Sequence, residues 1–441
     1  MNRPSPVSET LNSENGIGTT IPPWKTLRKR PHSQSALGRV LILDGNTRCA
    51  LAATRSLGRK GVHVVVADVA ERTLSGASRY CRQSFTYPSP ASNPEGFLTI
   101  VKRECSLRRI GVILPMTELT TATVLRHHED FRSLRVPFGE FKAFDKLTDK
   151  WRMLKLAQQL HLSIPKTLFI AGIDALGDVG QELKFPLVLK PRCSLIWSQA
   201  RWIPTSVHYA RSADELKEIV VRYEYFRERP FLIQEYISGQ GEGVFALYDH
   251  GRPVAFFGHR RLRERPAAGG VSVLSESIEP NPEAQRIARA LLESVGWHGV
   301  AMVEFKVSAE GTPYLIEVNA RFWGSLQLAI DAGVDFPWLL YQMAVGRKVG
   351  NVKPYATGVK CRWLLGDFVR LCQVLINGGS CPGPLPFRRV QSVLQFLNFC
   401  EKASRCEVNR WDDLKPFGVE VTQYIRALGS NFVNRKVRSR G

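Results

Sequence analysis

Two short apolar stretches, each interrupted by a glutamate, constrain the fold of this 441-residue chain more than any other feature. Residues 302–306 are Met-Val-Glu-Phe-Lys, and residues 315–321 are Leu-Ile-Glu-Val-Asn-Ala-Arg. The Ser-Ala-Glu-Gly segment between them suits the loop of a hairpin. We therefore predict adjacent antiparallel strands on which Glu304 and Glu317 point to one face. Asn319 shares that face because alternate residues of a strand lie on the same side.

The side chains on this face predict a metal and phosphate site. Two carboxylates and an amide oxygen are hard ligands, which hold Mg²⁺ together with phosphate oxygens. Arg321 falls on the same side and could contact the phosphates through two nitrogens. The alternative is an acidic hairpin with a solvated face. A glutamate between Ile316 and Val318 on a central strand would need partners, which disfavours that alternative.

Two weaker signals precede this hairpin in the chain. Residues 186–191 predict a buried strand ending near Lys190, and a buried ammonium needs an anion such as phosphate. Residues 231–237 predict another strand, which runs through a glycine-rich turn to Glu242. Backbone groups near Tyr236 could contact an adenine edge, and a carboxylate could accept from ribose hydroxyls. Taken alone, the first motif is a common strand end and the second a polar loop.

Residues 38–145 predict an α/β domain with a parallel sheet. The chain alternates predicted strands at 39–44, 62–67 and 110–115 with predicted helices at 48–60 and 95–108. This alternation is typical of a Rossmann-like sheet covered on both faces. Gly45 alone is a weak dinucleotide signal, because Thr47 and Ala50 replace the other two glycines. Asp68 could bind a ribose, but we expect that only the fold is shared.

Residues 146–350 predict an α+β domain. Helices are expected at 148–160 and 282–295, and hairpin strands at 244–248 with 254–258 and at 300–307 with 313–318. Residues 259–265 are strongly basic and lead to a glycine pair at 269 and 270. This basic segment could face phosphate and a carboxylate, because both call for planar arginine donors. The alternative is a solvated loop.

The charge of the chain lies mostly at its ends. Of the net +21, residues 346–441 carry +11, from 17 Lys and Arg against 6 Asp and Glu, and residues 1–40 carry +4. We therefore favour a solvated basic periphery and expect no specific nucleic-acid partner. Residues 1–37 predict a disordered basic tail. Residues 351–441 predict a small basic C-terminal extension, with helices at 362–376 and 388–399 around a turn, and carry no identifiable chemistry.

The cysteine pattern and the hydropathy suggest a location. The chain has nine cysteines and no Cys-x-x-Cys pair, which argues against a zinc site and a disulfide framework. No apolar stretch is long enough for a membrane span, and the first forty residues lack an apolar signal region. We expect a cytoplasmic protein that could form oligomers.

In their order along the chain, these motifs resemble the ATP-grasp superfamily, at the end that contains the carbamoyl phosphate synthetase large chain and biotin carboxylase. The resemblance covers about residues 38–350 and implies a pre-ATP-grasp domain, an ATP-grasp domain and the cofactors ATP and Mg²⁺, with Mn²⁺ possible in place of Mg²⁺. It implies that Lys150 and Lys190 contact the ATP phosphates and that Glu242 binds the ribose. The residues that it implies at the adenine are Gln234, Glu235, Tyr236 and Ile237. It also implies that Mg²⁺ is held by Glu304, Glu317 and Asn319, that Arg321 lies near the γ-phosphate, and that Arg321 and Lys190 are the catalytic residues.

One segment departs from the family pattern. The family usually has a glycine- and serine-rich flap after the strand lysine, whereas residues 192–202 contain no glycine. The resemblance implies an ATP-dependent ligase that activates a carboxylate as an acyl phosphate and joins it to an amine. The altered flap supports an alternative, an ATP-binding protein with a regulatory or non-ligase role. The sequence identifies neither substrate, although resembling enzymes such as D-aspartate ligase use amino acids.

Overall fold

The computed structural model describes residues 38–438, apart from residues 178, 199–200, 267–269, 351, 353, 378–384 and 399–403. The predicted disordered basic tail, residues 1–37, lies outside the described residues. Most of the predicted turn after residue 377 lies outside them too.

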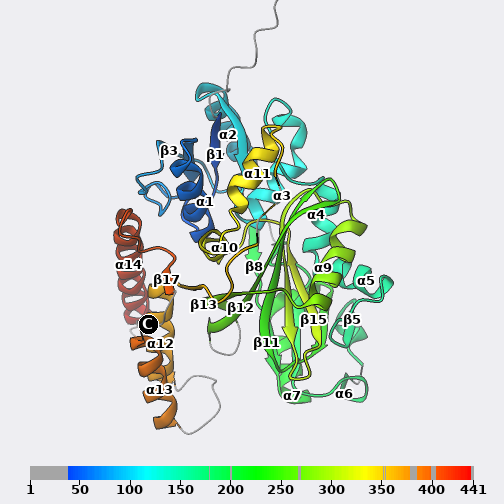
Figure 1. Cartoon of the computed structure of the whole chain (residues 1–441). Coiled ribbons are helices and arrows are strands. Elements are labelled where there is room, and N and C mark those ends of the chain that lie inside the picture. Colours follow the sequence, from blue (N-terminus) through cyan, green and yellow to red (C-terminus); the bar gives the residue numbers. More distant parts are fainter. Residues whose placement is uncertain are drawn as a thin grey trace, which may run out of the picture. The chain divides into compact units, whose positions relative to one another are not determined.

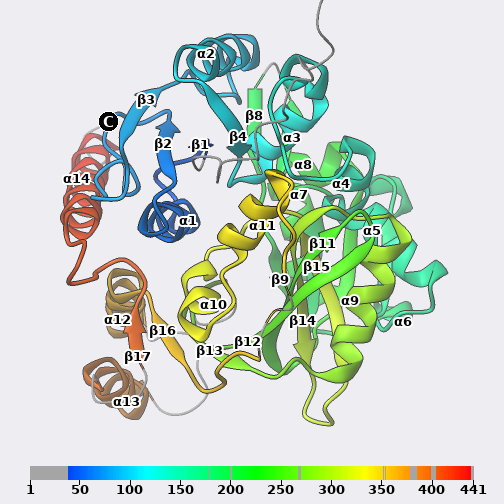
Figure 2. The same ribbon diagram turned by 45° about the horizontal axis from the view of Figure 1, so that its top comes forward.

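The first sheet is parallel, as predicted, with the strand order β3-β2-β1-β4. Its strands are β1 (Arg39–Ile42), β2 (His63–Asp68), β3 (Gln83–Thr86) and β4 (Ile110–Leu114). Its helices are α1 (Arg48–Arg59), α2 (Pro94–Leu107) and α3 (Glu118–Arg126). Figure 2 shows α1 and α2 on opposite sides of β1 and β2. Because successive strand residues face opposite ways, Val40 packs in the core of α1 and Leu41 in that of α2. The predicted Rossmann-like sheet is confirmed.

The second sheet has the order β5-β10-β6-β9 and is antiparallel. Its strands are β5 (Thr167–Ile170), β6 (Leu187–Pro191), β9 (His208–Ala210) and β10 (Phe231–Glu235). The neighbouring helices are α4 (Phe141–Thr148), α5 (Lys150–Gln159), α6 (Val179–Glu182), α7 (Ala213–Arg222) and α8 (Glu224–Glu228). Asp149 caps α5 by accepting from the Arg152 N–H, so the helix begins at Lys150.

The third sheet is larger than predicted and has the order β15-β14-β11-β12-β13-β16-β17. Its strands are β11 (Gln240–Asp249), β12 (Arg252–Arg265), β13 (Val271–Ile278), β14 (Gly299–Val307), β15 (Pro313–Asn319), β16 (Lys360–Arg362) and β17 (Ser404–Cys406). Figure 1 shows the long strands of this sheet in green and yellow. Its helices are α9 (Pro282–Ser294), α10 (Leu326–Ala332) and α11 (Phe336–Ala344). The basic residues 259–265 belong to strand β12, which corrects the solvated-loop alternative.

The C-terminal segment was predicted as a small extension, but β16 and β17 continue the main sheet beyond β13. Its helices are α12 (Leu364–Asn377), α13 (Leu385–Leu397) and α14 (Lys415–Arg438). The prediction missed both strands because each has only three residues and no usable periodicity. The domain boundaries after residues 145 and 350 stay predictions.

A buried arginine ties this C-terminal segment to α1. Arg55 is completely buried, and its Nε donates to Asp413 Oδ2 at 2.8 Å. Its terminal nitrogens donate to the carbonyl oxygens of Glu407, Val408 and Asp413 at 2.8–2.9 Å. A buried charge is tolerated when its partners are as complete as these. The segment just before α14 is therefore fixed against α1.

None of the helices in the described part of the chain combines the length and apolar character that crossing a membrane requires.

Candidate functional site

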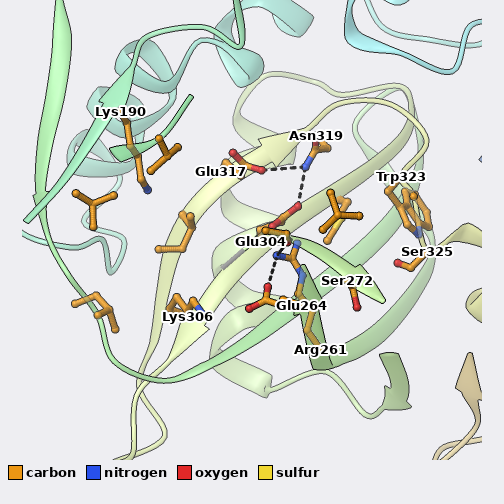
Figure 3. Close-up of a pocket in the computed structure, with 18 of the residues that line it drawn as sticks. Lys190, Arg261, Glu264, Ser272, Glu304, Lys306, Glu317, Asn319, Trp323 and Ser325 are labelled. Carbon is orange, nitrogen blue, oxygen red and sulfur yellow. Dashed lines mark hydrogen bonds and ion pairs between the residues drawn. The ribbon is translucent and has the colours of Figure 1, made fainter. Parts of the chain in front are cut away.

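A cavity of about 500 Å³ lies between the second and third sheets. Lys190 and Gln234 enter its wall from the second sheet, whereas Glu304, Glu317 and Asn319 enter from the third. Figure 3 shows Lys190 on the far side of the cavity from this acidic group. The structure thus brings together residues that the sequence placed on separate strands.

The two glutamates of the predicted metal site stand directly opposite each other. Glu304 on β14 pairs with Glu317 on β15 in the antiparallel register. Asn319 Nδ2 lies 2.9 Å from Glu304 Oε1 and 3.5 Å from Glu317 Oε1, as the dashed lines of Figure 3 show. Like charges at opposed positions repel, so this arrangement needs nearby cations. The period-2 prediction for these three side chains agrees with their observed positions.

Cationic side chains surround the acidic pair. Arg261 on β12 forms an ion pair with Glu304 and lies 3.0 Å from Glu264. Lys150 Nζ, at the start of α5, lies 3.7 Å from Glu317 Oε2. Lys150 does not line the cavity itself, but its contact with Glu317 brings it to the edge of the acidic group.

Burial and mutual attraction shift the pKa values of this group. Burial lowers the pKa of Lys190 to about 8, although Glu317 opposes the shift. Burial alone would raise the pKa of Glu317, but Lys150, Lys190 and Arg261 outweigh it and lower that pKa. Burial raises the pKa of Glu304 despite its ion pair with Arg261. A buried lysine with a depressed pKa gains most from an added anion, which fits a phosphate at this position.

Arg321, predicted at the γ-phosphate, also lines the cavity. Its Nη1 donates to the carbonyl oxygen of Phe322 at 2.7 Å, whereas its Nε is buried and makes no hydrogen bond within the described part of the chain. A buried donor without a partner is costly in a folded protein. The guanidinium is therefore held in place with capacity left for an anion.

The predicted adenine residues line the other part of the cavity. Gln234 is almost fully buried; its Nε2 donates to Thr167 Oγ1 at 2.8 Å, while its Oε1 has no partner among the described residues. The Tyr236 N–H is already bonded to the Pro186 carbonyl oxygen, so it is not free for a ligand. Ile237 adds apolar surface.

Glu235 reaches the rim of the same cavity. Its Oε1 accepts from the Lys184 N–H at 3.1 Å, which fixes the carboxylate to the chain beside β6. This contact holds the Glu235 carboxylate at the rim, where it supports the shape of the pocket.

Glu242, predicted at the ribose, is not among the described residues that line the cavity. On β11, Gly241 and Gly243 pair with Lys306 and Glu304, both of which line the cavity. Glu242 lies between the two glycines and so points to the opposite face of the sheet. The sequence suggested this glutamate because it lies in a glycine-rich turn, but β11 begins at Gln240, and strand register decides the side.

The sequence did not single out Arg261, although it noted the basic segment that contains it. His259 and Arg261 line the cavity and alternate with Arg260, which pairs with Glu276 instead. His259 is buried against Phe245, and its Nδ1 lies 3.3 Å from Ser325 Oγ. Burial holds the pKa of His259 well below its usual value. The period-2 rule could have identified this pair once residues 259–265 were recognised as a strand.

The glycine-free segment after Lys190 forms a two-stranded hairpin of β7 (Leu195–Ser198) and β8 (Arg201–Pro204). Its base is fixed near the start of α5. Arg192 Nε lies 2.6 Å from Asp149 Oδ2, and the Arg192 carbonyl oxygen accepts from the Lys150 N–H at 3.0 Å. A β-hairpin therefore occupies the flap position without the family's glycines.

Comparison with known proteins agrees with this geometry. The sequence profile of the family described as "ATP-grasp in the biosynthetic pathway with Ter operon" matches residues 227–366. The carbamoyl phosphate synthase large chain of Caldanaerobacter subterraneus subsp. tengcongensis is 25% identical over 313 residues, which cover 68% of this chain and 27% of the relative. D-aspartate ligase of Enterococcus faecium is 22% identical over 196 residues, which cover 42% of this chain and 47% of the relative. The chain thus matches less than half the length of either relative.

A solved structure shares the fold at low sequence identity. The L-amino acid ligase of Bacillus licheniformis superposes with a TM-score of 0.58 and 17% identity, over 72% of this chain and 77% of the ligase. The parallel sheet, the antiparallel sheets, the motif order and the profile match agree with one another. Residues 227–366 thus match an ATP-grasp family, and the chain as a whole is distantly similar to ATP-grasp enzymes.

Proposed function

We propose that this protein is an ATP- and magnesium-dependent ligase that activates a carboxylate as an acyl phosphate and joins it to an amine. The observation that carries the proposal is the Glu304–Glu317–Asn319 group facing Lys190 across one cavity. Two similar proteins are named as a D-aspartate ligase and an L-amino acid ligase, which favours a carboxylate and an amine as substrates.

In this proposal, ATP lies along the cavity with its adenine between the apolar residues near Ile237. The free Oε1 of Gln234 accepts from the exocyclic amino group, which would satisfy a buried acceptor. Lys190 and Lys150 contact the phosphates and lower the repulsion among their charges.

The acidic group fits magnesium by its donor chemistry. Glu304 and Glu317 supply hard oxygen ligands, and half a turn of the Asn319 amide would present its oxygen in place of Nδ2. When bound, Mg²⁺ neutralises phosphate charge and orients the γ-phosphate for in-line attack. Arg261 balances the charge of Glu304, so one acid of the group is already paired.

The reaction needs no protein nucleophile. A carboxylate oxygen attacks the γ-phosphorus, the bond to the bridging oxygen breaks, and ADP leaves with that electron pair. The amine nitrogen then attacks the acyl carbon, and phosphate leaves as the amide forms. Arg321 and Lys190 hold the transferred group in line while its charge is redistributed.

ADP release tests the proposal. The protein is given ATP and Mg²⁺ with panels of carboxylates and amines, alone and in pairs. We expect ADP release that requires both a carboxylate and an amine, and hydroxamate formation when hydroxylamine replaces the amine. If ATP binds but no carboxylate promotes ADP release or hydroxamate formation, the ligase proposal fails.

The altered flap keeps one alternative open, an ATP-binding protein with a regulatory or non-ligase role. A flap without glycines would close differently over ATP. The glycine-free β7–β8 hairpin therefore favours this alternative. The same measurements separate the two, because this alternative predicts ATP binding without any substrate-dependent turnover.

A further inference from the structure

A second cavity, of about 410 Å³, adjoins the first. Both cavities are lined by Arg48, Arg321 and Gly324. Gly324 permits this close arrangement, because a Cβ there would lie 3.0 Å from Arg48 Nη2. The second cavity therefore begins where the transferred phosphate of the proposed reaction would lie.

Three distant segments form the wall of this second cavity. Asn46, Thr47 and Cys49 come from the end of β1 and the start of α1, and Thr117 comes from the start of α3. The C-terminal segment supplies the remaining polar wall, with Trp363, Glu420, Gln423 and Tyr424. Gln423 Nε2 donates to Asn46 Oδ1 at 3.0 Å, which joins α14 to the first sheet.

Among the described residues that line this cavity, Glu420 is the one carboxylate, and it is 4% exposed. Its Oε1 accepts from Trp363 Nε1 at 2.7 Å, whereas its Oε2 is buried and makes no hydrogen bond to any residue that the structure describes. Burial raises the pKa of Glu420 to about 7. A buried carboxylate oxygen without a donor is costly, so a donor supplied by a ligand would stabilise this site.

The ring of Trp363, which donates to Glu420, contacts two cations. The guanidinium carbons of Arg48 and Arg265 lie 4.0 and 4.7 Å from the ring centre. Arg48 also forms an ion pair with Glu407, and Arg265 donates to the Tyr424 hydroxyl at 2.8 Å. These contacts fix the Glu420 carboxylate in position, and none of them involves its Oε2.

The other wall of the cavity suits an anionic group. Arg48 and Arg321 are cationic, and α1 and α3 both begin there, after the capping residues Thr47 and Thr117. The first-turn N–H groups of a helix favour an anion. A ligand that meets both walls carries an ammonium and an acidic group.

We propose that the second cavity binds the amine substrate, an amino acid whose ammonium donates to Glu420 and whose carboxylate lies near Arg48 and the starts of α1 and α3. This inference rests on the proposed ligase function. One ammonium proton passes to Glu420 Oε2, the nitrogen attacks the acyl carbon, and phosphate leaves with the electron pair of the broken C–O bond. The second nitrogen proton goes to solvent.

Binding without ATP tests this proposal separately from turnover. Each proteinogenic amino acid and D-aspartate is titrated into wild type and Glu420→Gln, with the matching acid that lacks the amine as a second ligand. The glutamine keeps an oxygen for Trp363 and removes only the charge. We expect at least one amino acid to bind wild type and to lose tenfold or more in affinity for the variant, whereas the acid without an amine binds both alike.

Asp412→Asn is the matched control, because Asp412 is an exposed carboxylate of the same C-terminal segment that bonds to Arg59 and Tyr80. It should leave amino-acid affinity unchanged. If Glu420→Gln does not fold, the pH dependence of binding to wild type replaces it. Affinity should fall as Glu420 becomes protonated below about pH 7, with Arg48, Arg265 and Glu407 as its charged neighbours.

The outcomes are distinct. If no amino acid binds wild type, or if Glu420→Gln or low pH leaves affinity unchanged, the amine-site proposal is overturned, and Glu420 serves only to orient Trp363. If amino acids bind as expected but no pair of substrates promotes ADP release, the ligase proposal fails while the cavity remains an amino-acid site.

Discussion

The two adjoining cavities differ in how their walls are built. The acidic wall of the first comes from β14 and β15, neighbouring strands joined by a short loop. The second depends on residues far apart in the chain, such as Asn46 and Gln423, which are separated by 377 positions. Strand periodicity in the sequence therefore predicts the acidic wall of the first cavity. The second cavity depends instead on packing between residues that are far apart in the chain.

Sites built on one hairpin can be predicted from a sequence more readily than sites built from distant segments. A chemically distinctive set on one hairpin can be read because strand geometry fixes which residues share a face. Glu420 lies on a helix, and the residues near it in the sequence form no recognisable motif. Its position depends on the contacts of Arg55, Trp363 and Arg48. Substitutions in each part of the chain can test whether the two cavities depend on such different segments.

The largest effect is expected at the acidic hairpin. Glu317→Gln should abolish ATP turnover and leave the fold intact, because the proposed magnesium site loses one charged ligand. Steady-state ADP release and a melting curve would measure both properties. Glu310→Gln, in the exposed loop of the same hairpin, is the control and should behave like wild type. Near-normal turnover in Glu317→Gln would remove this residue from the metal site.

The next effect concerns the anchor of the second cavity. Arg55→Met should lower the free energy of unfolding by about 3–5 kcal/mol, because Asp413 would remain buried without its partner. Arg59 lies on the same helix as Arg55 and forms an exposed ion pair with Asp412. Arg59→Met should lower the free energy of unfolding by less than about 1 kcal/mol. Denaturant titration of both variants would compare them. Equal losses would show that the C-terminal segment does not depend on this buried contact.

A smaller effect is expected at the phosphate side of the first cavity. Lys190→Met keeps the bulk of the side chain and removes its charge, so ATP binding should weaken by about 1.5–3 kcal/mol, or tenfold or more. Adenosine should bind both proteins alike, because the lysine is proposed to contact phosphates. Calorimetric titration with each ligand would decide. An equal loss for ATP and adenosine would mean that Lys190 only supports the pocket.

The same lysine predicts a pH dependence. Its pKa is lowered to about 8 in the free protein, and bound phosphates should raise it again. ATP affinity is therefore expected to be greatest below pH 8 and to fall as pH rises through and above that value, because binding then requires uptake of a proton. Lys190→Met should lack this decline. A decline of the same size in the variant would assign it to another group.

The smallest effect is expected at Glu242. Because this side chain lies on the face of β11 away from the cavity, Glu242→Gln should change ATP affinity by less than about 0.5 kcal/mol. Titration with ATP would measure this change beside that of Lys190→Met. A loss of tenfold would restore the ribose contact that the sequence suggested and would contradict the observed register.

The parallel first sheet, the acid-bearing hairpin and the common face of Glu304, Glu317 and Asn319 could all be predicted from the sequence. These features follow from strand periodicity and from the cost of burying unpaired acids, both of which act locally. Three features became visible only in the folded chain: Glu242 faces away from the cavity, Arg261 pairs with Glu304, and α14 closes a second cavity. Register, buried ion pairs and contacts across hundreds of residues depend on how whole sheets and helices pack, and no local pattern specifies them.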